Sequence, residues 1–235
     1  MNLENFQAQL ETEREWRESE IRFLDNNQRA LSNDNDRKLM RRAILCLIYA
    51  HIEGFVQFAF SLYVDEINKE NLVCSDVKPA IAAAALHKEF NALRNIDMRS
   101  KLLKNSSSDD KYLRRFSRDI EFVENIGGFY SHPISIPESF IDTNNNVGKE
   151  VLEKLLFQVG LEYEDLKSIY SPLTRLLNVR NDIAHGKRKA GIEDKEYQIF
   201  LDCSRNIISS ISGRLTTAYG SKEFLKIPSS KISAY

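Results

Sequence analysis

The twelve residues 178–189 read NVRNDIAHGKRK, and their side chains could carry out proton transfer on a phosphate ester. Arg180 offers a planar fork of donors that matches phosphate oxygens and could stabilise the extra charge of a five-coordinate transition state. A histidine side chain can exchange a proton near neutral pH, so His185 could remove a proton from a ribose 2′-hydroxyl or return one. Asn181 could orient the imidazole or hold a phosphate oxygen, and Asp182 could orient Arg180 or cap a local donor. This chemistry needs no metal, and it requires RNA because DNA lacks the 2′-hydroxyl.

The segment is expected to close a helix that begins at Pro172, a residue tolerated in a first helical turn. Asn181 and His185 are four residues apart and would therefore lie on one face. Gly186 fits the left-handed position that ends a helix. His185 would then lie in the last turn, exposed on at least one edge. One side of the helix would stay apolar through Leu173, Leu176, Leu177, Val179 and Ile183.

A purely structural interpretation of the same residues stays open. A histidine cation near a helix end favours the carbonyl-rich terminus, and an arginine close to an aspartate often makes only a surface ion pair. Lys187, Arg188 and Lys189 form a local basic patch that could grip an RNA backbone, although charge runs on loops are commonly just solvated. Six residues at common spacing also match by chance in many helical proteins.

The surrounding chain has the periodicity of helices, so the predicted fold class is all-α. The break at 105–110 should cap the helix after it, and Gly127 with Gly128 should end that helix. The stretch 127–148 is the best loop candidate and could hold one short strand. The expected helices cover residues 1–31, 37–68, 78–93, 111–125, 147–159, the segment after Pro172, and 193–218.

Composition narrows the class of protein. Apolar residues at 42% and charged residues at 29% are ordinary for a globular chain, and a net charge of −1 leaves any attraction to nucleic acid local. Cys46, Cys74 and Cys203 lack metal-ligand spacing and indicate core positions in a reducing compartment. The charged amino terminus leaves no place for a signal peptide, and the longest apolar run, 43–50, is too short to span a bilayer. We expect a cytoplasmic protein without a metal or other cofactor.

Two motifs resemble the HEPN superfamily of helical nucleotide-binding domains. RNDIAHG is similar to its arginine–four residues–histidine signature, and YAHIEGF at 49–55 resembles the first core helix of a toxin-like branch with a YAHxEGF pattern. The resemblance implies one HEPN-like helical bundle over 1–235. Its expected parts are an N-terminal helix (1–36), core helices (37–70 and 165–220) and a helical insertion with a long loop (71–164).

The resemblance also implies a function. Arg180 and His185 would be the catalytic pair of a metal-independent endoribonuclease, with Asn181 as the polar residue that follows the arginine. Two subunits would bring their motifs together in a composite cleft, so a homodimer is expected. The setting would be toxin–antitoxin or phage defence, with an antitoxin protein as a further partner. A non-catalytic HEPN module that binds RNA, nucleotide or protein is the alternative, and a plain helical interaction protein is a third.

The first motif holds further candidates. On a helix, Tyr49 and Glu53 share one side, where Glu53 would need a partner, and Arg180 is the expected one. Glu53 could orient Arg180 or His185, or it could form a buried structural salt bridge. His51 points to the opposite side of the helix, so it ranks below Glu53 as a supporting residue. His132 lies in the loop, where nothing in the sequence places it near a site.

Overall fold

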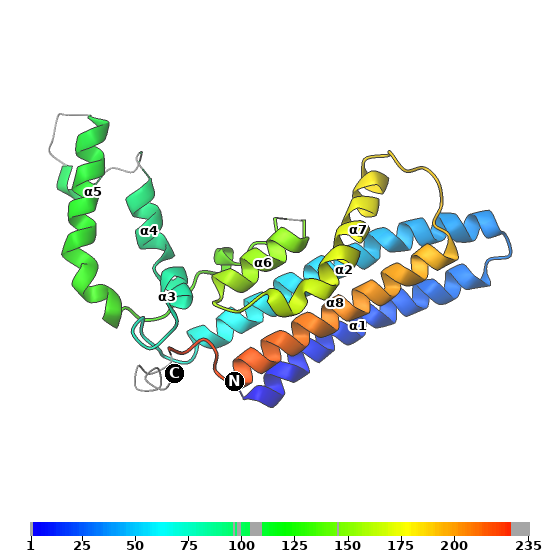
Figure 1. The fold of residues 1–235 in the computed structure, drawn as a ribbon, viewed down its shortest axis with the longest axis horizontal. Coiled ribbons are helices and arrows are strands. Elements are labelled where there is room, and N and C mark those ends of the chain that lie inside the picture. Colours follow the sequence, from blue (N-terminus) through cyan, green and yellow to red (C-terminus); the bar gives the residue numbers. More distant parts are fainter. Residues whose placement is uncertain (1, 96, 98–99, 104–109, 145, 227–235) are drawn as a thin grey trace. The chain divides into compact units, whose positions relative to one another are not determined.

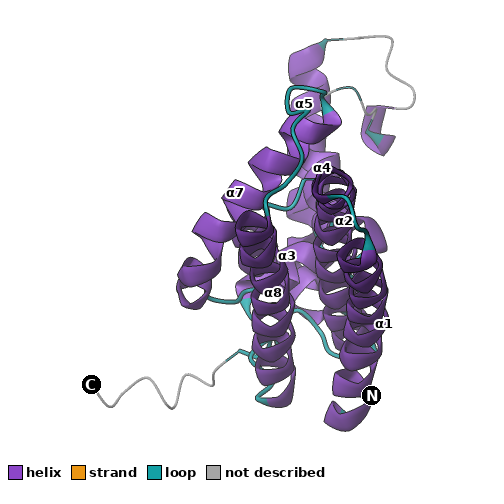
Figure 2. Ribbon diagram, turned by 90° about the vertical axis from the view of Figure 1, so that its right-hand side faces the viewer, coloured by secondary structure: helices purple, strands orange, loops and turns teal. Residues whose placement is uncertain are grey.

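The computed structural model describes residues 2–95, 97, 100–103, 110–144 and 146–226. These residues form eight α-helices and short 3-10 turns, and the described part of the chain contains no strand, which confirms the all-α expectation (Figures 1 and 2). The chain divides into two compact units. The first comprises 1–64, 141–157 and 161–223, and the second comprises 65–140, 158–160 and 224–235. The prediction of a single domain stays a prediction.

Three long helices dominate the first unit: α1 (Leu3–Ala30), α2 (Asp34–Asn68) and α8 (Asp194–Gly220). They lie side by side in both ribbon views (Figures 1 and 2). Their shared core is aromatic and aliphatic because each helix carries apolar residues three and four apart. The largest fully buried side chains of these three helices are Phe6, Tyr49, Phe55, Phe60, Tyr63, Tyr197 and Phe200.

Helix α7 (Lys167–Ala184) packs on α8 and carries the RNDIAHG segment at its end. The prediction that Pro172 begins this helix was wrong, since the proline lies inside it. The helix starts five residues earlier because Ile169 and Tyr170 are buried and extend its apolar side backwards. A proline this near the start removes only one hydrogen bond of the ladder, which packing can offset.

Helix α6 (Lys149–Gln158) also belongs to the first unit, except for its last residue, Gln158, which belongs to the second. Its buried residues are Leu152, Leu155 and Leu156. Among the described helices, α2 alone is long and apolar enough to cross a membrane by length and composition, although a charged residue, Arg42, and a polar one, His51, flank the run 43–50. More than half of its most apolar window, 56%, is buried inside the structure. The core helix of a globular protein passes the same test of length and composition. The apolar character of α2 is therefore weak evidence for a membrane span.

The second unit holds α3 (Pro79–Ala85), α4 (His87–Arg94) and α5 (Lys111–Asn125). The helix predicted over 78–93 is interrupted at Leu86, which separates α3 from α4. Asp110 caps α5 by accepting from the backbone N–H groups of Tyr112 and Leu113, while 105–109 lie outside the described residues. The predicted loop contains 3-10 turns at Ile126–Ser131 and Glu138–Phe140.

No strand forms in the described part of that loop, which has only an isolated bridge between Val73 and Pro133. The side chain of Asn68, the last residue of α2, holds the loop in place. Its amide donates to the carbonyl of Ile136 at 3.0 Å and accepts from the N–H of the same residue at 2.8 Å. An amide pairing with both backbone groups replaces the bonds that a neighbouring strand would supply.

Candidate functional site

Arg180 of α7 lies over the ring of Tyr49 of α2, with its guanidinium carbon 4.7 Å from the ring centroid. Tyr49 is fully buried, and its hydroxyl donates to the carbonyl of Val147 at 3.1 Å. One nitrogen of Arg180 donates to the side-chain oxygen of Asn181 at 2.9 Å. A cation over an aromatic face is held in place electrostatically, so Tyr49 and Asn181 together orient the guanidinium.

Glu53 and Cys46 share this face of α2, at spacings of four and three residues from Tyr49. Burial raises the pKa of Glu53 above its ordinary value more than the nearby charge of Arg180 lowers it. Burial likewise raises the pKa of the Cys46 thiol, against a smaller opposing effect of Arg180. The structure therefore brings Glu53 into the electrostatic reach of Arg180. The charge of Arg180 acts on Glu53 through space, and no ion pair within 4.0 Å joins these two described side chains.

His185 is the C-cap residue of α7, and its side chain is exposed. Its backbone N–H bonds to the carbonyl of Asn181 at 2.9 Å, and that of Gly186 bonds to Ile183 at 3.1 Å. Gly186 has a φ of +70°, the left-handed conformation expected of a residue that ends a helix. The helix end thus presents the imidazole to solvent one turn beyond the Asn181 side chain.

The segment after His185 is anchored at two places. Arg188 makes two hydrogen bonds to the carboxylate of Glu196 on α8, at 3.3 and 2.6 Å, and its backbone N–H bonds to the carbonyl of Asp182. Further along, the N–H of Ile192 bonds to the carbonyl of Lys38 on α2 at 3.0 Å. These contacts hold the loop against α8 and α2. They therefore determine the path of the chain directly after His185.

The expected basic patch is therefore divided. Lys187 and Lys189 are exposed, whereas Arg188 is paired with Glu196 and half-buried. Asp182 is half-buried and lines a hollow of about 680 Å³ on the α6 and α7 side of the first unit, together with Arg175. The cations free to meet an RNA backbone in this segment are Lys187 and Lys189.

His51 is not brought together with Arg180. It is buried against α1, where its Nε2 lies 2.8 Å from a carboxylate oxygen of Glu20 and its ring packs edge-on against Trp16 at 5.1 Å. Burial lowers the pKa of His51 more than the neighbouring carboxylate raises it. These contacts fit a role in joining α1 to α2.

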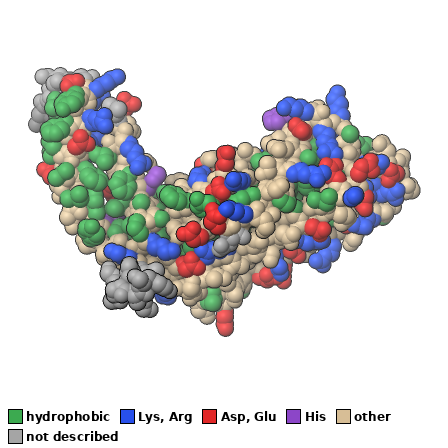
Figure 3. All heavy atoms as spheres, in the orientation of Figure 1, with side chains coloured by type: hydrophobic (Ala, Val, Ile, Leu, Met, Phe, Trp, Pro, Cys, Tyr) green, Lys and Arg blue, Asp and Glu red, His purple; other side chains and the backbone are tan. Residues whose placement is uncertain are grey.

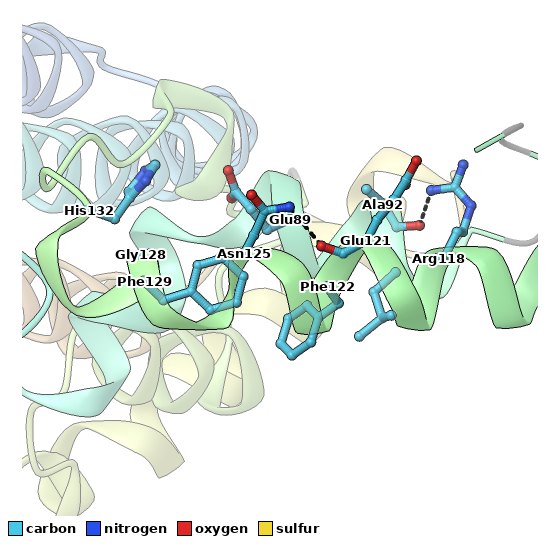
Figure 4. Close-up of a pocket in the computed structure, with 10 residues that line it drawn as sticks. Glu89, Ala92, Arg118, Glu121, Phe122, Asn125, Gly128, Phe129 and His132 are labelled. Atoms are coloured by element: carbon cyan, nitrogen blue, oxygen red, sulfur yellow. Dashed lines mark hydrogen bonds between the residues drawn. The ribbon is translucent and has the colours of Figure 1, made fainter. Parts of the chain in front are cut away.

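His132 lies in the second unit, beside a hollow of about 370 Å³. Phe122 and Phe129 form part of its wall, together with Glu89 and Asn125 (Figure 4). In the described residues, no three His, Cys, Asp or Glu side chains gather as ligands for a metal ion. Cys46 is the neighbour of Arg180 that sequence reasoning missed, although its spacing from Tyr49 could have indicated it.

Comparison with known families identifies the class. A HEPN family model, described as RiboL-PSP-HEPN, matches residues 12–217, which is most of the chain. The chain therefore belongs to the RiboL-PSP-HEPN family, within a superfamily whose members are generally ribonucleases, and its all-α structure is consistent with the HEPN helical bundle. No curated protein and no solved structure gave a significant match.

Proposed function

We propose that the protein is a metal-independent endoribonuclease whose catalytic residues are Arg180 and His185. The main support for the proposal is the different placement of these two side chains at the end of α7. The arginine is held between an aromatic ring and an amide, while the imidazole is exposed to solvent. Catalysis benefits from a charge fixed in advance and from a proton carrier that the substrate can reach.

In the proposed reaction, the imidazole of His185 takes the proton of a ribose 2′-hydroxyl. The 2′-oxygen then forms a bond to the adjacent phosphorus, and the bond from phosphorus to the 5′-oxygen of the next nucleotide breaks. That oxygen takes the proton from the protonated His185, which leaves a 2′,3′-cyclic phosphate and a 5′-hydroxyl. Arg180 stabilises the negative charge on the phosphate oxygens, with Asn181 holding its guanidinium.

The rest of the proposal concerns binding. Lys187 and Lys189 contact the RNA backbone beside the scissile linkage. Two copies of the chain bring their Arg180 and His185 residues to one cleft. Since each imidazole is exposed, each is accessible to a second subunit and to RNA. The protein acts in the cytoplasm, as a toxin controlled by an antitoxin protein or in phage defence.

The chemistry is tested by incubating the purified chain with RNA in excess EDTA and analysing the product ends. We expect cleavage with 2′,3′-cyclic phosphate ends, and none at 2′-O-methylated positions. His185→Ala and Arg180→Ala should reduce the rate at least 100-fold. His132→Ala, which changes a histidine of the second unit, is the matched control and should cleave normally. Cleavage that requires magnesium, or that survives His185→Ala, contradicts the proposal.

A non-catalytic HEPN module is the second candidate, and the packing of Arg180 on Tyr49 favours it, because such a contact also serves stability. It predicts intact RNA and a lower Tm for Arg180→Ala. The biological setting has a separate test. Induced expression of the wild-type chain should arrest growth, and His185→Ala should not. A small neighbouring gene that relieves the arrest would identify the antitoxin.

A further inference from the structure

Helix α5 and the turn after it expose a continuous apolar stripe. Phe116, Ile120 and Val123 are separated by four and three residues, so they lie on one side of the helix. Soluble proteins rarely leave so many large apolar side chains together in water unless they bind something. Green side chains gather over this part of the surface in Figure 3. The exposed fractions are 76% for Tyr112, 53% for Phe116, 38% for Ile120, 65% for Val123, 53% for Ile126 and 71% for Tyr130.

Two contacts of α5 with α4 come from another side of the helix. Phe122 contacts Phe90 of α4 with ring centroids 6.1 Å apart, and Arg118 donates to the carbonyl of Ala92. Phe122 and Arg118 point away from Phe116 on a helix of 100° per residue. The helix is therefore apolar on the side that is exposed as well as on part of the side that packs.

The exposed charges beside the stripe divide along the helix. Arg115 lies in the amino-terminal half, and Asp119 and Glu124 lie in the carboxy-terminal half. Two such helices that pair antiparallel place each basic half over an acidic half, and their helix dipoles also oppose. Parallel pairing would place like charges together. The surface is thus complementary to itself under a two-fold axis.

We infer that the α5 stripe binds the α5 stripe of a second copy of this chain, in antiparallel orientation. With the two-fold axis at the level of Arg118, Phe116 packs against the partner's Ile120. The same register sets Arg115 beside the partner's Asp119, since both residues lie on one flank of the stripe. The interface involves the second unit alone, and the inference does not depend on the proposed ribonuclease activity.

The size of the stripe limits its strength. A helix of 15 residues is about 22 Å long, and one such pair buries less than the roughly 800 Å² per partner of stable complexes. We therefore expect association with a Kd in the micromolar range, which falls within reach of sedimentation analysis.

A paired-cysteine experiment locates the contact. A tagged Phe116→Cys chain is mixed with an untagged Ile120→Cys chain and oxidised mildly. Close approach of these positions should give at least tenfold more mixed disulfide than a control pair of Phe23→Cys with Ile120→Cys, because Phe23 is an exposed phenylalanine of α1. The native cysteines are buried or half-buried, and the wild-type chain sets the background. A yield equal to that of the control pair overturns the inference.

A charge exchange tests the orientation. An association step that Phe116→Glu weakens and Phe23→Glu leaves unchanged is the step that depends on α5. Phe23→Glu is thus the matched control. Arg115→Glu and Asp119→Arg should each raise the Kd of that step at least fivefold, and the double variant should return it to within twofold of wild type. A double variant as weak as either single one overturns antiparallel self-pairing. So does a Phe116→Glu chain that associates like wild type, since the stripe would then serve another partner.

Discussion

Arg180 and Tyr49 form a cation–π pair, with the guanidinium carbon 4.7 Å from the centroid of a ring that is itself fully buried. Tyr49→Phe keeps this ring and removes the hydrogen bond to the carbonyl of Val147. We expect it to lower the free energy of unfolding by about 1 kcal/mol, measured by urea titration, and to leave RNA cleavage unchanged.

Tyr49→Leu removes the ring as well. We expect a larger loss of stability, about 2–4 kcal/mol, and a cleavage rate at least tenfold lower, since Arg180 loses the surface that orients it. The phenylalanine variant is the control for this comparison. If Tyr49→Leu cleaves RNA as fast as Tyr49→Phe, the ring serves packing alone.

Glu53 gives a prediction about pH. Burial raises its pKa above the ordinary value of 4.5, so the folded protein disfavours the ionised carboxylate. A raised pKa means that the contribution to stability is fully present below pH 4.5 and is lost as the pH rises through the folded-state value. Glu53→Gln should therefore match wild type in urea unfolding near pH 4 and be more stable at pH 7.

The matched control is Glu150→Gln, which removes one exposed carboxylate from α6. If Glu53→Gln is less stable than wild type at pH 7, ionised Glu53 has a stabilising partnership with Arg180. In that case the buried salt bridge suggested by the sequence would be the correct interpretation.

Arg188 distinguishes loop anchoring from RNA contact. It makes a two-pronged ion pair with Glu196, and this pairing is the main reason that the pKa of Glu196 is lowered. Both side chains are partly buried, at 27% and 19% exposure, so we expect Arg188→Ala and Glu196→Ala each to lower the free energy of unfolding by about 1 kcal/mol. The double variant should lose less than the sum of the two.

RNA binding separates the two roles further. Lys187→Ala, which removes an exposed cation next to Arg188, should leave stability unchanged and weaken RNA binding. If Arg188→Ala weakens RNA binding as Lys187→Ala does, while Glu196→Ala leaves it intact, then Arg188 contacts RNA directly.

The sequence predicted the helices well where apolar periodicity was long, as in α1, α2 and α8. It misplaced the start of α7 because Pro172 was taken as a boundary, whereas burial of Ile169 and Tyr170 extends the helix past it. It expected Lys78–Leu93 to be one helix, and the chain turns at Leu86 instead. Local propensity does not contain the tertiary contacts that decide such boundaries.

The site shows the same limit. Helical spacing placed Tyr49 and Glu53 on one side of α2 and His51 on the other, as the structure has them. It could not show that Arg188 is paired with Glu196 or that Arg180 lies over Tyr49. The first contact crosses the loop between α7 and α8, and the second joins helices far apart in the sequence, so both follow from how the helices pack.

Gly191 tests whether the loop after His185 matters for activity. A Cβ at this position would lie 2.5 Å from the Cβ of Lys38 and 2.7 Å from its carbonyl carbon, too close for any side chain. Gly191→Ala must therefore push the loop away from α2 and strain the bond from Ile192 to the Lys38 carbonyl. We expect a loss of about 1–3 kcal/mol in unfolding free energy and a cleavage rate reduced severalfold.

The control is Gly213→Ala in α8, where nothing lies within 4 Å of the added carbon. An alanine inside a helix loses less backbone entropy than glycine, so this variant should gain about 0.5–1 kcal/mol and cleave normally. Because the loop joins the helix that ends at His185 to α8, a shift at Gly191 reaches the imidazole through the chain itself. A Gly191→Ala protein that is destabilised but cleaves RNA at the wild-type rate would show that the position of this loop does not control the orientation of His185.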